Sequence, residues 1–152
     1  MFGDATRELA QQIADDGFVP DAVLAVARGG LGLAMGLAYA LDVKDLAMVN
    51  VELYTGIGTR LDAPVFLSPE PAAADLRGKR VLVADDVADS GLTLQAVLEW
   101  CSAHVAQARS AVLFRKPPSV VDPDYVWRLT DRWIDFPWSW QGRVTASAMM
   151  GE

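Results

Sequence analysis

The sequence predicts an α/β fold: a mostly parallel central sheet flanked by helices, with a small hood formed by C-terminal residues 117–152. Short apolar runs rich in valine and alanine recur along the chain, which is typical of buried parallel strands. Segments with helical spacing alternate with these runs, as right-handed strand–helix–strand crossovers require. Tryptophans gather near the C-terminus and suggest the hood. All 152 residues, 1–152, are expected to form one domain.

The N-terminal half is expected to contain two helices and two strands. In chain order they are a helix over Ala5–Gly17, a strand over Ala22–Ala27, a helix over Leu31–Leu41 and a strand over Leu46–Tyr54. Leu9 and Ile13 give the first helix its apolar face. We expect Asp4 to be the N-cap of this helix and Gly17 to end it.

The second half begins with residues 55–79, where the pattern is weak. Glycines and prolines interrupt this segment and its Ala72–Asp75 stretch offers no core face, so we expect a lid or binding loop here. Regular structure then returns with a strand over Val81–Ala84, a helix over Thr93–His104, a strand over Ala111–Arg115 and a short strand around Tyr125–Arg128.

The composition argues against several classes of protein. A net charge of −7 disfavours nucleic-acid binding, because the chain has no basic stripe to neutralise phosphates. Apolar stretches are interrupted well before the length of a membrane span, and the N-terminus does not resemble a secretory signal, so we expect a cytoplasmic protein. The single cysteine, Cys101, allows no internal disulfide and is expected to be a buried, unreactive thiol.

The most informative segment runs from Val81 to Thr93. Its apolar residues lead into Asp85 and Asp86, and a third acid, Asp89, precedes a Ser-Gly-Leu-Thr sequence. Since ligands of open α/β sheets bind at the carboxyl ends of strands, we expect these side chains at a binding edge. Backbone N–H groups, hydroxyls and a helix N-terminus in this segment suit a phosphate. Acids beside a phosphate imply that a cation or sugar hydroxyls lie between them.

Parts of this acid-rich pattern also occur in proteins of other kinds. In a purely structural alternative, Asp85 and Asp86 end a strand while Asp89 or Ser90 caps the next helix. Nucleotide hydrolases also place an acid after a strand, but they need an upstream G-x-x-x-x-G-K-[ST] loop that this chain lacks. Receiver domains carry such an acid pair after their first strand, whereas here it follows the third expected strand.

A second motif, Arg28-Gly29-Gly30, follows the first expected strand. On its own this motif is more often a turn than a site. Its place after a buried strand, however, predicts that it lies at the same sheet edge as the acids. The Arg28 guanidinium matches phosphate oxygens, and the two glycines allow an anion to approach the backbone closely.

Together these segments resemble the type I phosphoribosyltransferases. The apolar strand, the two acids and Ser90–Thr93 match that family's fingerprint, and Ala27–Gly30 matches its pyrophosphate loop. The segments Phe114–Pro117 and Asp131–Trp138 are similar to the C-terminal half of bacterial xanthine–guanine phosphoribosyltransferases. The resemblance covers nearly the whole chain apart from 55–79, and it implies the type I phosphoribosyltransferase fold and a cis peptide bond after Ala27.

The resemblance implies a reaction of 5-phosphoribosyl-1-pyrophosphate (PRPP) with a purine base, which releases pyrophosphate and uses Mg²⁺ as cofactor. Asp85 and Asp86 would hold the ribose hydroxyls, and Asp86 would also be the metal ligand. Arg28 and a lid residue, Arg60, would bind pyrophosphate. The full set implied to bind PRPP is Arg28, Gly29, Arg60, Asp85, Asp86, Ala88, Asp89, Ser90, Gly91, Leu92 and Thr93.

The resemblance also implies how the base is recognised. Asp89 would be the catalytic residue, taking the N7 proton of the purine as general base while N9 attacks the ribose. Lys116 would donate to O6, and Trp133 or Ile134 would stack on the ring. The expected substrate is therefore a 6-oxopurine: guanine, xanthine or hypoxanthine.

Several alternatives stay open. Lys116 as a solvated surface lysine and the tryptophans as core residues are the purely structural ones. A PRPP- or nucleotide-sensing regulatory protein on the same fold, or a phosphoribosyltransferase for another base, are the functional ones, since Leu92 and residues 55–79 depart from the family pattern. The tryptophan-rich tail also leads us to expect a homo-oligomer, a dimer or tetramer.

Overall fold

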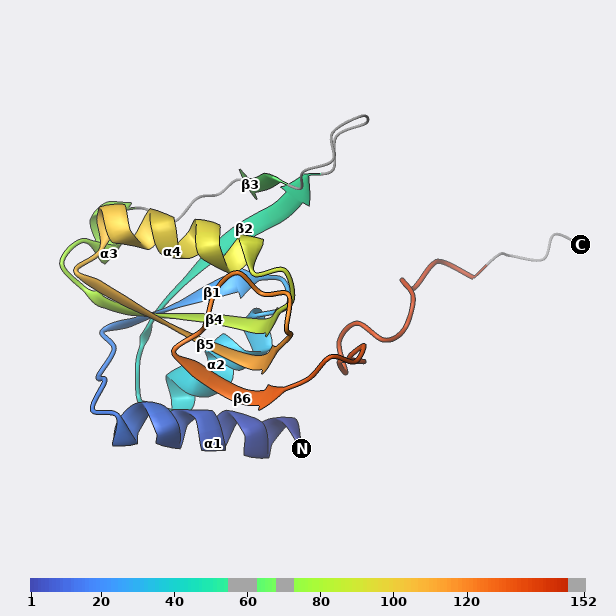
Figure 1. Ribbon diagram of the computed structural model, residues 1–152, viewed down its shortest axis with the longest axis horizontal. Helices are drawn as coiled ribbons and strands as arrows, with labels where there is room; N and C mark the ends of the chain where they lie inside the picture. Colours follow the sequence, from blue (N-terminus) through green and yellow to red (C-terminus); the bar gives the residue numbers. More distant parts are fainter. Residues whose placement is uncertain (55–62, 68–72, 148–152) are drawn as a thin grey trace, which may run out of the picture.

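The computed structural model is built around a six-stranded sheet. It describes residues 1–54, 63–67 and 73–147. The strands lie in the order β3-β2-β1-β4-β5-β6, and all neighbouring pairs are parallel except β2 with β3 (Figure 1). In chain order the elements are α1 (Phe2–Asp15), β1 (Ala22–Ala27), α2 (Leu31–Ala40), β2 (Asp45–Tyr54), β3 (Ala63–Leu67), α3 (Ala73–Leu76), β4 (Arg80–Ala88), α4 (Leu92–His104), β5 (Gln107–Arg115) and β6 (Tyr125–Leu129). The mostly parallel α/β fold predicted from the sequence is confirmed.

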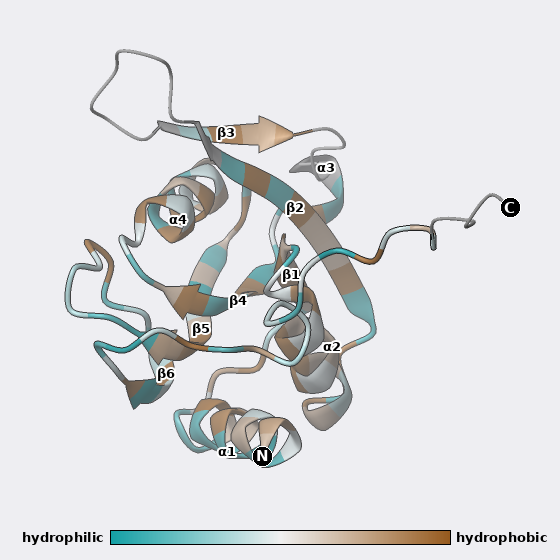
Figure 2. Cartoon of the chain, turned by 90° about the vertical axis from the view of Figure 1, so that its right-hand side faces the viewer, coloured by the Kyte–Doolittle hydropathy of each residue, from teal (hydrophilic) through white to brown (hydrophobic). Residues whose placement is uncertain are grey.

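Helices cover both faces of the sheet (Figures 1 and 2). α1 and α2 pack on one face, where Leu9, Leu33 and Leu37 are buried. α4 packs on the other face and buries Leu94 and Val97. All six residues of β1 are buried, because this strand lies between two helical layers in the middle of the sheet. This position explains why the β1 sequence is an unbroken apolar run instead of an alternating one.

The first helix begins earlier than the sequence predicts. It starts at Phe2 with Met1 as its N-cap, so the prediction of Asp4 as N-cap is wrong. Asp4 lies instead in the first turn, where its negative charge is favourable to the helix dipole. Gly17 follows the helix end and has a φ of +76°, a left-handed conformation that favours glycine.

β4 is longer than predicted. The strand extends to Ala88 because its pairing with β5 continues as far as Ala88 opposite Arg115. Asp85 and Asp86 therefore lie inside the strand near its carboxyl end, not in a loop after it.

The segment expected as a lid, residues 55–79, contains regular structure that the sequence does not predict. β3 pairs antiparallel with β2, with Pro64 opposite Leu53 in the register. Proline is tolerated there because β3 is an edge strand and one side of its backbone needs no partner. α3 follows, and its Leu76 is buried in the core on the α4 side of the sheet.

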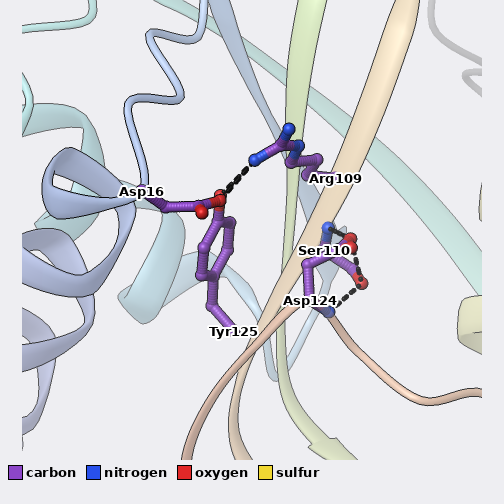
Figure 3. A network of polar contacts seen from close by, with 5 residues as sticks. All are labelled: Asp16, Arg109, Ser110, Asp124 and Tyr125. Atoms are coloured by element: carbon purple, nitrogen blue, oxygen red, sulfur yellow. Dashed lines mark hydrogen bonds and ion pairs between the residues drawn. The ribbon is translucent and has the colours of Figure 1, made fainter.

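Polar contacts tie the amino ends of β5 and β6 to the end of α1 (Figure 3). Tyr125 Oη donates to Asp16 Oδ2 over 2.7 Å. Arg109 Nη1 donates to Tyr125 Oη over 2.9 Å and also pairs with Asp16. The backbone N–H of Ser110 donates to Asp124 Oδ2 over 2.8 Å. These bonds anchor the edge strand β6 at the end of the sheet opposite the predicted site.

After β6, residues 130–147 form no helix or strand. Aromatic rings hold the first part of this segment to the body of the protein. Phe136 is buried and stacks on Trp138 with ring centroids 4.9 Å apart, and its ring centroid lies 6.0 Å from that of Phe114 on β5. The Trp138 ring also meets Phe2 of α1 edge-on at 5.3 Å.

The structure bears on two features expected from composition, the lack of a membrane-spanning helix and the burial of Cys101. Within the described ranges, no helix is both long enough and apolar enough to cross a bilayer. The predicted burial of Cys101 is confirmed, and this burial raises the pKa of its thiol to about 11.

Candidate active site

Two chain segments meet at the carboxyl edge of the parallel strands, which faces the viewer in Figure 2. One is the Arg28–Gly30 loop after β1, and the other is the end of β4. A Cβ atom built on Gly29 would lie 2.6 Å from the carboxylate carbon of Asp86, so the loop backbone is in close contact with this acid. The peptide bond between Ala27 and Arg28 is cis, as the resemblance predicts. The structure thus brings the arginine loop and the acid pair together.

The two acids differ in environment. Asp85 is buried and its Oδ1 accepts the backbone N–H of Asp86 over 2.8 Å, whereas Asp86 is half-buried and its Oδ1 accepts the N–H of Val87 over 2.7 Å. Burial, and secondly the charge of Asp86, raise the pKa of Asp85 well above its usual range. A positive charge beside the pair would therefore be strongly favoured.

This donor set fits Mg²⁺ only in part. In the described ranges no three acidic, histidine or cysteine side chains gather as a cluster of metal ligands. Mg²⁺ is commonly held by one or two carboxylates together with substrate phosphates and water. Asp85 and Asp86 therefore suit an ion that arrives with a phosphorylated substrate.

The segment between β4 and α4 surrounds a small hollow. Its volume is about 200 Å³, and it is lined by Val26, Ala27, Val51, Asp85, Val87, Ala88, Asp89, Ser90, Gly91, Thr93 and Leu94. Gly91 is the N-cap of α4 with a φ of +78°, so neither Asp89 nor Ser90 is the N-cap residue that the structural alternative requires. Ser90 Oγ instead accepts the N–H of Leu92 over 3.3 Å. Leu92 is the first residue of α4, so Ser90 uses one of the N–H groups at the helix start, while those of Thr93 and Leu94 remain available to donate to an anion bound in the hollow.

The residues expected to recognise the base come together beside this hollow. Lys116 Nζ lies 3.3 Å from Asp89 Oδ2 and 5.5 Å from the centroid of the Trp133 ring. The Lys116 side chain is only 13% exposed, whereas that of Asp89 is 59% exposed. The lysine is therefore mostly covered by the protein, and the carboxylate is open to solvent. Ile134 is half-buried and packs against the core, whereas the Trp133 ring is exposed.

A turn formed by residues 116–121 forms hydrogen bonds to residues 88–91, here called the phosphate loop, and the sequence did not indicate this contact. The N–H of Lys116 donates to Ala88 O over 2.9 Å, and the N–H of Val120 donates to Ser90 O over 2.8 Å. Ser119 is buried, and its Oγ lies 2.5 Å from the position of a Cβ built on Gly91. The only sequence signal for this turn is the Pro117-Pro118 pair, which does not reveal its partner.

A wider hollow, of about 820 Å³, opens next to the arginine loop. Its lining consists of Arg28, Gly29, Leu31, Gly32, Asp86, Trp138, Ser139, Gln141, Gly142 and Arg143. Arg143 lines the same hollow as Arg28, and no motif in the sequence singles it out. Arg60, the predicted lid arginine, lies outside the described residues.

These observations define a class of protein. A phosphate loop at a helix N-terminus, an acid pair and an arginine loop share one edge of a parallel sheet, and a lysine–carboxylate pair with an aromatic ring stands beside them. The chain belongs to the phosphoribosyltransferase family: residues 1–143 match the phosphoribosyl transferase domain. It is therefore a phosphoribosyltransferase with the type I fold predicted from the sequence.

Within this family, the chain is similar to proteins named as purine phosphoribosyltransferases. The chain is 34% identical over 146 residues to a xanthine-guanine phosphoribosyltransferase of Ruegeria sp. (strain TM1040), covering 88% of this chain and 78% of that protein. The structure resembles a purine phosphoribosyltransferase from Pyrococcus horikoshii with a TM-score of 0.79 and 34% identity, covering 95% and 92% of the two chains. It also resembles a Neisseria gonorrhoeae hypothetical protein with bound ppGpp (TM-score 0.76, 26% identity, 90% and 84% covered).

Proposed function

We propose that this protein transfers the 5-phosphoribosyl group of PRPP to a 6-oxopurine (guanine, xanthine or hypoxanthine) and releases pyrophosphate, in purine salvage. The observation that carries the proposal is the Lys116–Asp89 pair beside Trp133, because Asp89 also lines the hollow of about 200 Å³ between β4 and α4, here called the phosphate hollow. A purine above this pair would meet a donor at O6 and an acceptor at N7. The names of the Ruegeria and Pyrococcus relatives support the same substrate class.

In the proposed PRPP complex, the loop before α4 binds the 5′-phosphate. Backbone N–H groups from Ala88 to Thr93, with the hydroxyls of Ser90 and Thr93, would surround it. Asp85 and Asp86 would accept hydrogen bonds from the ribose 2′- and 3′-hydroxyls. Positioning matters because the reacting carbon becomes positively charged as the leaving group departs, and fixed groups orient it toward the base.

The pyrophosphate of PRPP would occupy the wider hollow. Arg28 would donate to its oxygens, while Gly29 lets the backbone approach without a side chain. Asp86, which lies against Gly29, would be the protein ligand of Mg²⁺. When bound there, Mg²⁺ neutralises the charge of the leaving pyrophosphate. Arg60 keeps its predicted role at this end as part of the proposal.

At the base end, Asp89 would accept the N7 proton while N9 attacks the sugar carbon. Its exposure fits this role, since the base must reach the carboxylate from solvent. Lys116 would exchange its contact with Asp89 for O6 of the purine, and a 6-amino group would offer it no acceptor. Trp133 or Ile134 would stack on the purine ring.

The test is a turnover screen. Guanine, xanthine, hypoxanthine, adenine, uracil and orotate are each incubated with the protein, PRPP and Mg²⁺, and pyrophosphate release is followed. Turnover with at least one 6-oxopurine and none with adenine is the expected result. Turnover with only a pyrimidine or with adenine would identify a transferase for another base and overturn the substrate assignment.

A second candidate is a nucleotide-sensing role on the same fold, and the ppGpp-bound neighbour favours it. Two diphosphate groups on one guanosine would find cations in Arg28 and Arg143 and a purine site at Lys116. Titration with ppGpp by calorimetry, beside the turnover screen, separates the two candidates. Tight binding with no turnover of any base would favour the sensor.

We propose in addition that the protein acts in the cytoplasm as a homo-oligomer, a dimer or tetramer. Trp133 and Trp140 are 83% and 63% exposed, so the tail remains one candidate contact between subunits.

A further inference from the structure

Two carbonyl groups of the phosphate loop point at the 116–121 turn. Ala88 O accepts the N–H of Lys116 over 2.9 Å, and Ser90 O accepts the N–H of Val120 over 2.8 Å. Ala88 and Ser90 both line the phosphate hollow, where a carbonyl oxygen directed inward would repel a phosphate. The turn therefore takes up two groups of the loop that are unfavourable to an anion.

The same two bonds set the direction of two backbone donors. The peptide bonds after Ala88 and Ser90 are trans, and the N–H of a trans peptide unit points opposite to its C=O. Because these carbonyls are bound to the turn, the N–H groups of Asp89 and Gly91 point away from it. Both residues line the phosphate hollow, and neither N–H donates to an acceptor within the described part of the chain. These two donors are therefore available to an anion.

Ser119 holds the turn in the shape that makes these bonds. Its side chain is buried, and its Oγ donates to Val121 O over 2.7 Å and accepts the N–H of Val121 over 3.3 Å. Its own N–H donates to Lys116 O over 3.1 Å. Val120 lies between the two residues that the hydroxyl joins, so the direction of the Val120 N–H is fixed by Ser119.

The Ser119 side chain also lies directly against the phosphate loop. A Cβ atom built on Gly91 would lie 2.5 Å from Ser119 Oγ and 2.9 Å from the backbone nitrogen of Val120. Gly91 has a φ of +78° as well, so both the backbone conformation and the close contact require glycine here. No space is left for the loop to move toward the turn.

We propose that Ser119 is a positioning residue for the 5′-phosphate of PRPP. It shapes the 116–121 turn, and the turn directs the N–H groups of Asp89 and Gly91 toward that phosphate. This inference rests on the proposed function. Ser119 is not among the residues that line the phosphate hollow, so it acts through the loop without touching the substrate. Its effect is therefore confined to ligands that carry the 5′-phosphate, and pyrophosphate, assigned to the Arg28 loop, does not depend on it.

Calorimetric titration with ribose 5-phosphate, and separately with pyrophosphate and Mg²⁺, tests the proposal without requiring turnover. Ser119→Ala is expected to weaken the affinity for ribose 5-phosphate about tenfold, the scale of the hydrogen bonds it loses, and to leave the affinity for pyrophosphate unchanged.

Ser110→Ala is the matched control. Ser110 is also buried, and its Oγ donates to Asp124 Oδ2 over 3.3 Å and accepts the N–H of Asp124 over 3.2 Å, at the opposite end of the sheet. This variant loses equivalent bonds, so a general loss of stability would affect both variants alike. Ser110→Ala is expected to keep the native affinity for both ligands.

NMR of the native chain covers the case that Ser119→Ala fails to fold. Ribose 5-phosphate is expected to move the amide proton resonances of Asp89 and Gly91 downfield, as donation to a phosphate oxygen does. Binding of the ligand without these shifts overturns the proposed orientation of the loop. Equal affinities of the native chain and Ser119→Ala, or an equal loss in Ser110→Ala, overturn this inference alone. A native chain that binds no ribose 5-phosphate overturns the proposed function together with it.

Discussion

At the scale of single residues, Asp89 carries the assignment of substrate class. It is the most exposed of the three acids near the phosphate hollow and the one that contacts Lys116. Asp85 and Asp86 accept backbone N–H groups and lie within β4, so their carboxylates are fixed by the sheet. This difference is what the proposed division of roles requires: two fixed acids for the sugar, and one accessible acid for the base.

Replacing Asp89 tests this division. Asp89→Asn keeps the shape but removes the proton acceptor, so kcat is expected to fall about 100-fold or more while PRPP affinity changes little. Steady-state kinetics and PRPP titration measure the two effects separately. Asp4→Asn, at an exposed acid in α1, is the matched control and should leave both kcat and PRPP affinity unchanged. An equal loss of turnover and of PRPP binding would show that Asp89 serves the sugar instead of the base.

At the scale of elements, the loop between β1 and α2 depends on two glycines for different reasons. A Cβ on Gly29 meets the Asp86 carboxylate, a side-chain group, whereas a Cβ on Gly30 would lie 2.6 Å from the carbonyl oxygen of Val26 and 2.9 Å from the Cα of Asp85. A side chain can move more easily than backbone, so the first position serves the site and the second serves the fold.

Alanine substitutions separate these two roles. Gly29→Ala should displace Asp86 and raise the KM for PRPP about tenfold or more, equivalent to about 1.4 kcal/mol, with little change in thermal stability. Gly30→Ala should lower the melting temperature instead, because the strand ends must move apart. Gly3→Ala, where a Cβ meets nothing within 4 Å, is the control. The interpretation fails if Gly29→Ala lowers the melting temperature while its KM for PRPP stays unchanged.

Helix α4 holds the protein's single cysteine in the core. Because burial raises the pKa of Cys101 to about 11, the thiol is protonated at pH 8, and the thiolate is the form that reacts. Iodoacetamide at pH 8 is therefore expected to leave the native protein unmodified and to label it fully in denaturant, as mass spectrometry would show. Rapid labelling of the native state would mean that α4 opens readily.

At the scale of the whole molecule, a chain of aromatic contacts joins the N-terminus, the sheet and the C-terminal segment. Phe2, Trp138, Phe136 and Phe114 touch in that order, and Phe136 is buried within the series. Since Trp138 lines the wider hollow, these rings also hold one wall of the site.

Removing the central ring tests this arrangement. Phe136→Ala is expected to lower the free energy of unfolding by about 3 kcal/mol, the usual cost of emptying a buried aromatic site. Chemical denaturation followed by tryptophan fluorescence measures it. Trp140→Ala, at an exposed ring on the same segment, should change stability little. Equal effects of the two substitutions would contradict the anchoring role of Phe136.

The sequence predicts those parts of the molecule that are determined by local pattern. β1 and α4 follow from apolar runs and helical spacing, and the acid and arginine motifs follow from their places after strands. β3 is missed because its short apolar run, Ala63–Leu67, contains Pro64 and lies among other prolines and glycines, which indicate a loop. β4 is predicted too short because its carboxyl end is held by β5. Arg143 and the turn at residues 116–121 act through contacts between distant segments, which no local pattern records.

The two backbone hydrogen bonds from the 116–121 turn to Ala88 and Ser90 have a consequence for protein engineering. They tie the backbone next to Lys116, the lysine assigned to the base, to the loop assigned to the sugar phosphate, so the two cannot move independently. An insertion or deletion at Pro117-Pro118, made to change which base is accepted, would also strain or break these bonds to the phosphate loop. Base preference in this scaffold is therefore best redesigned by exchanging side chains at fixed backbone length.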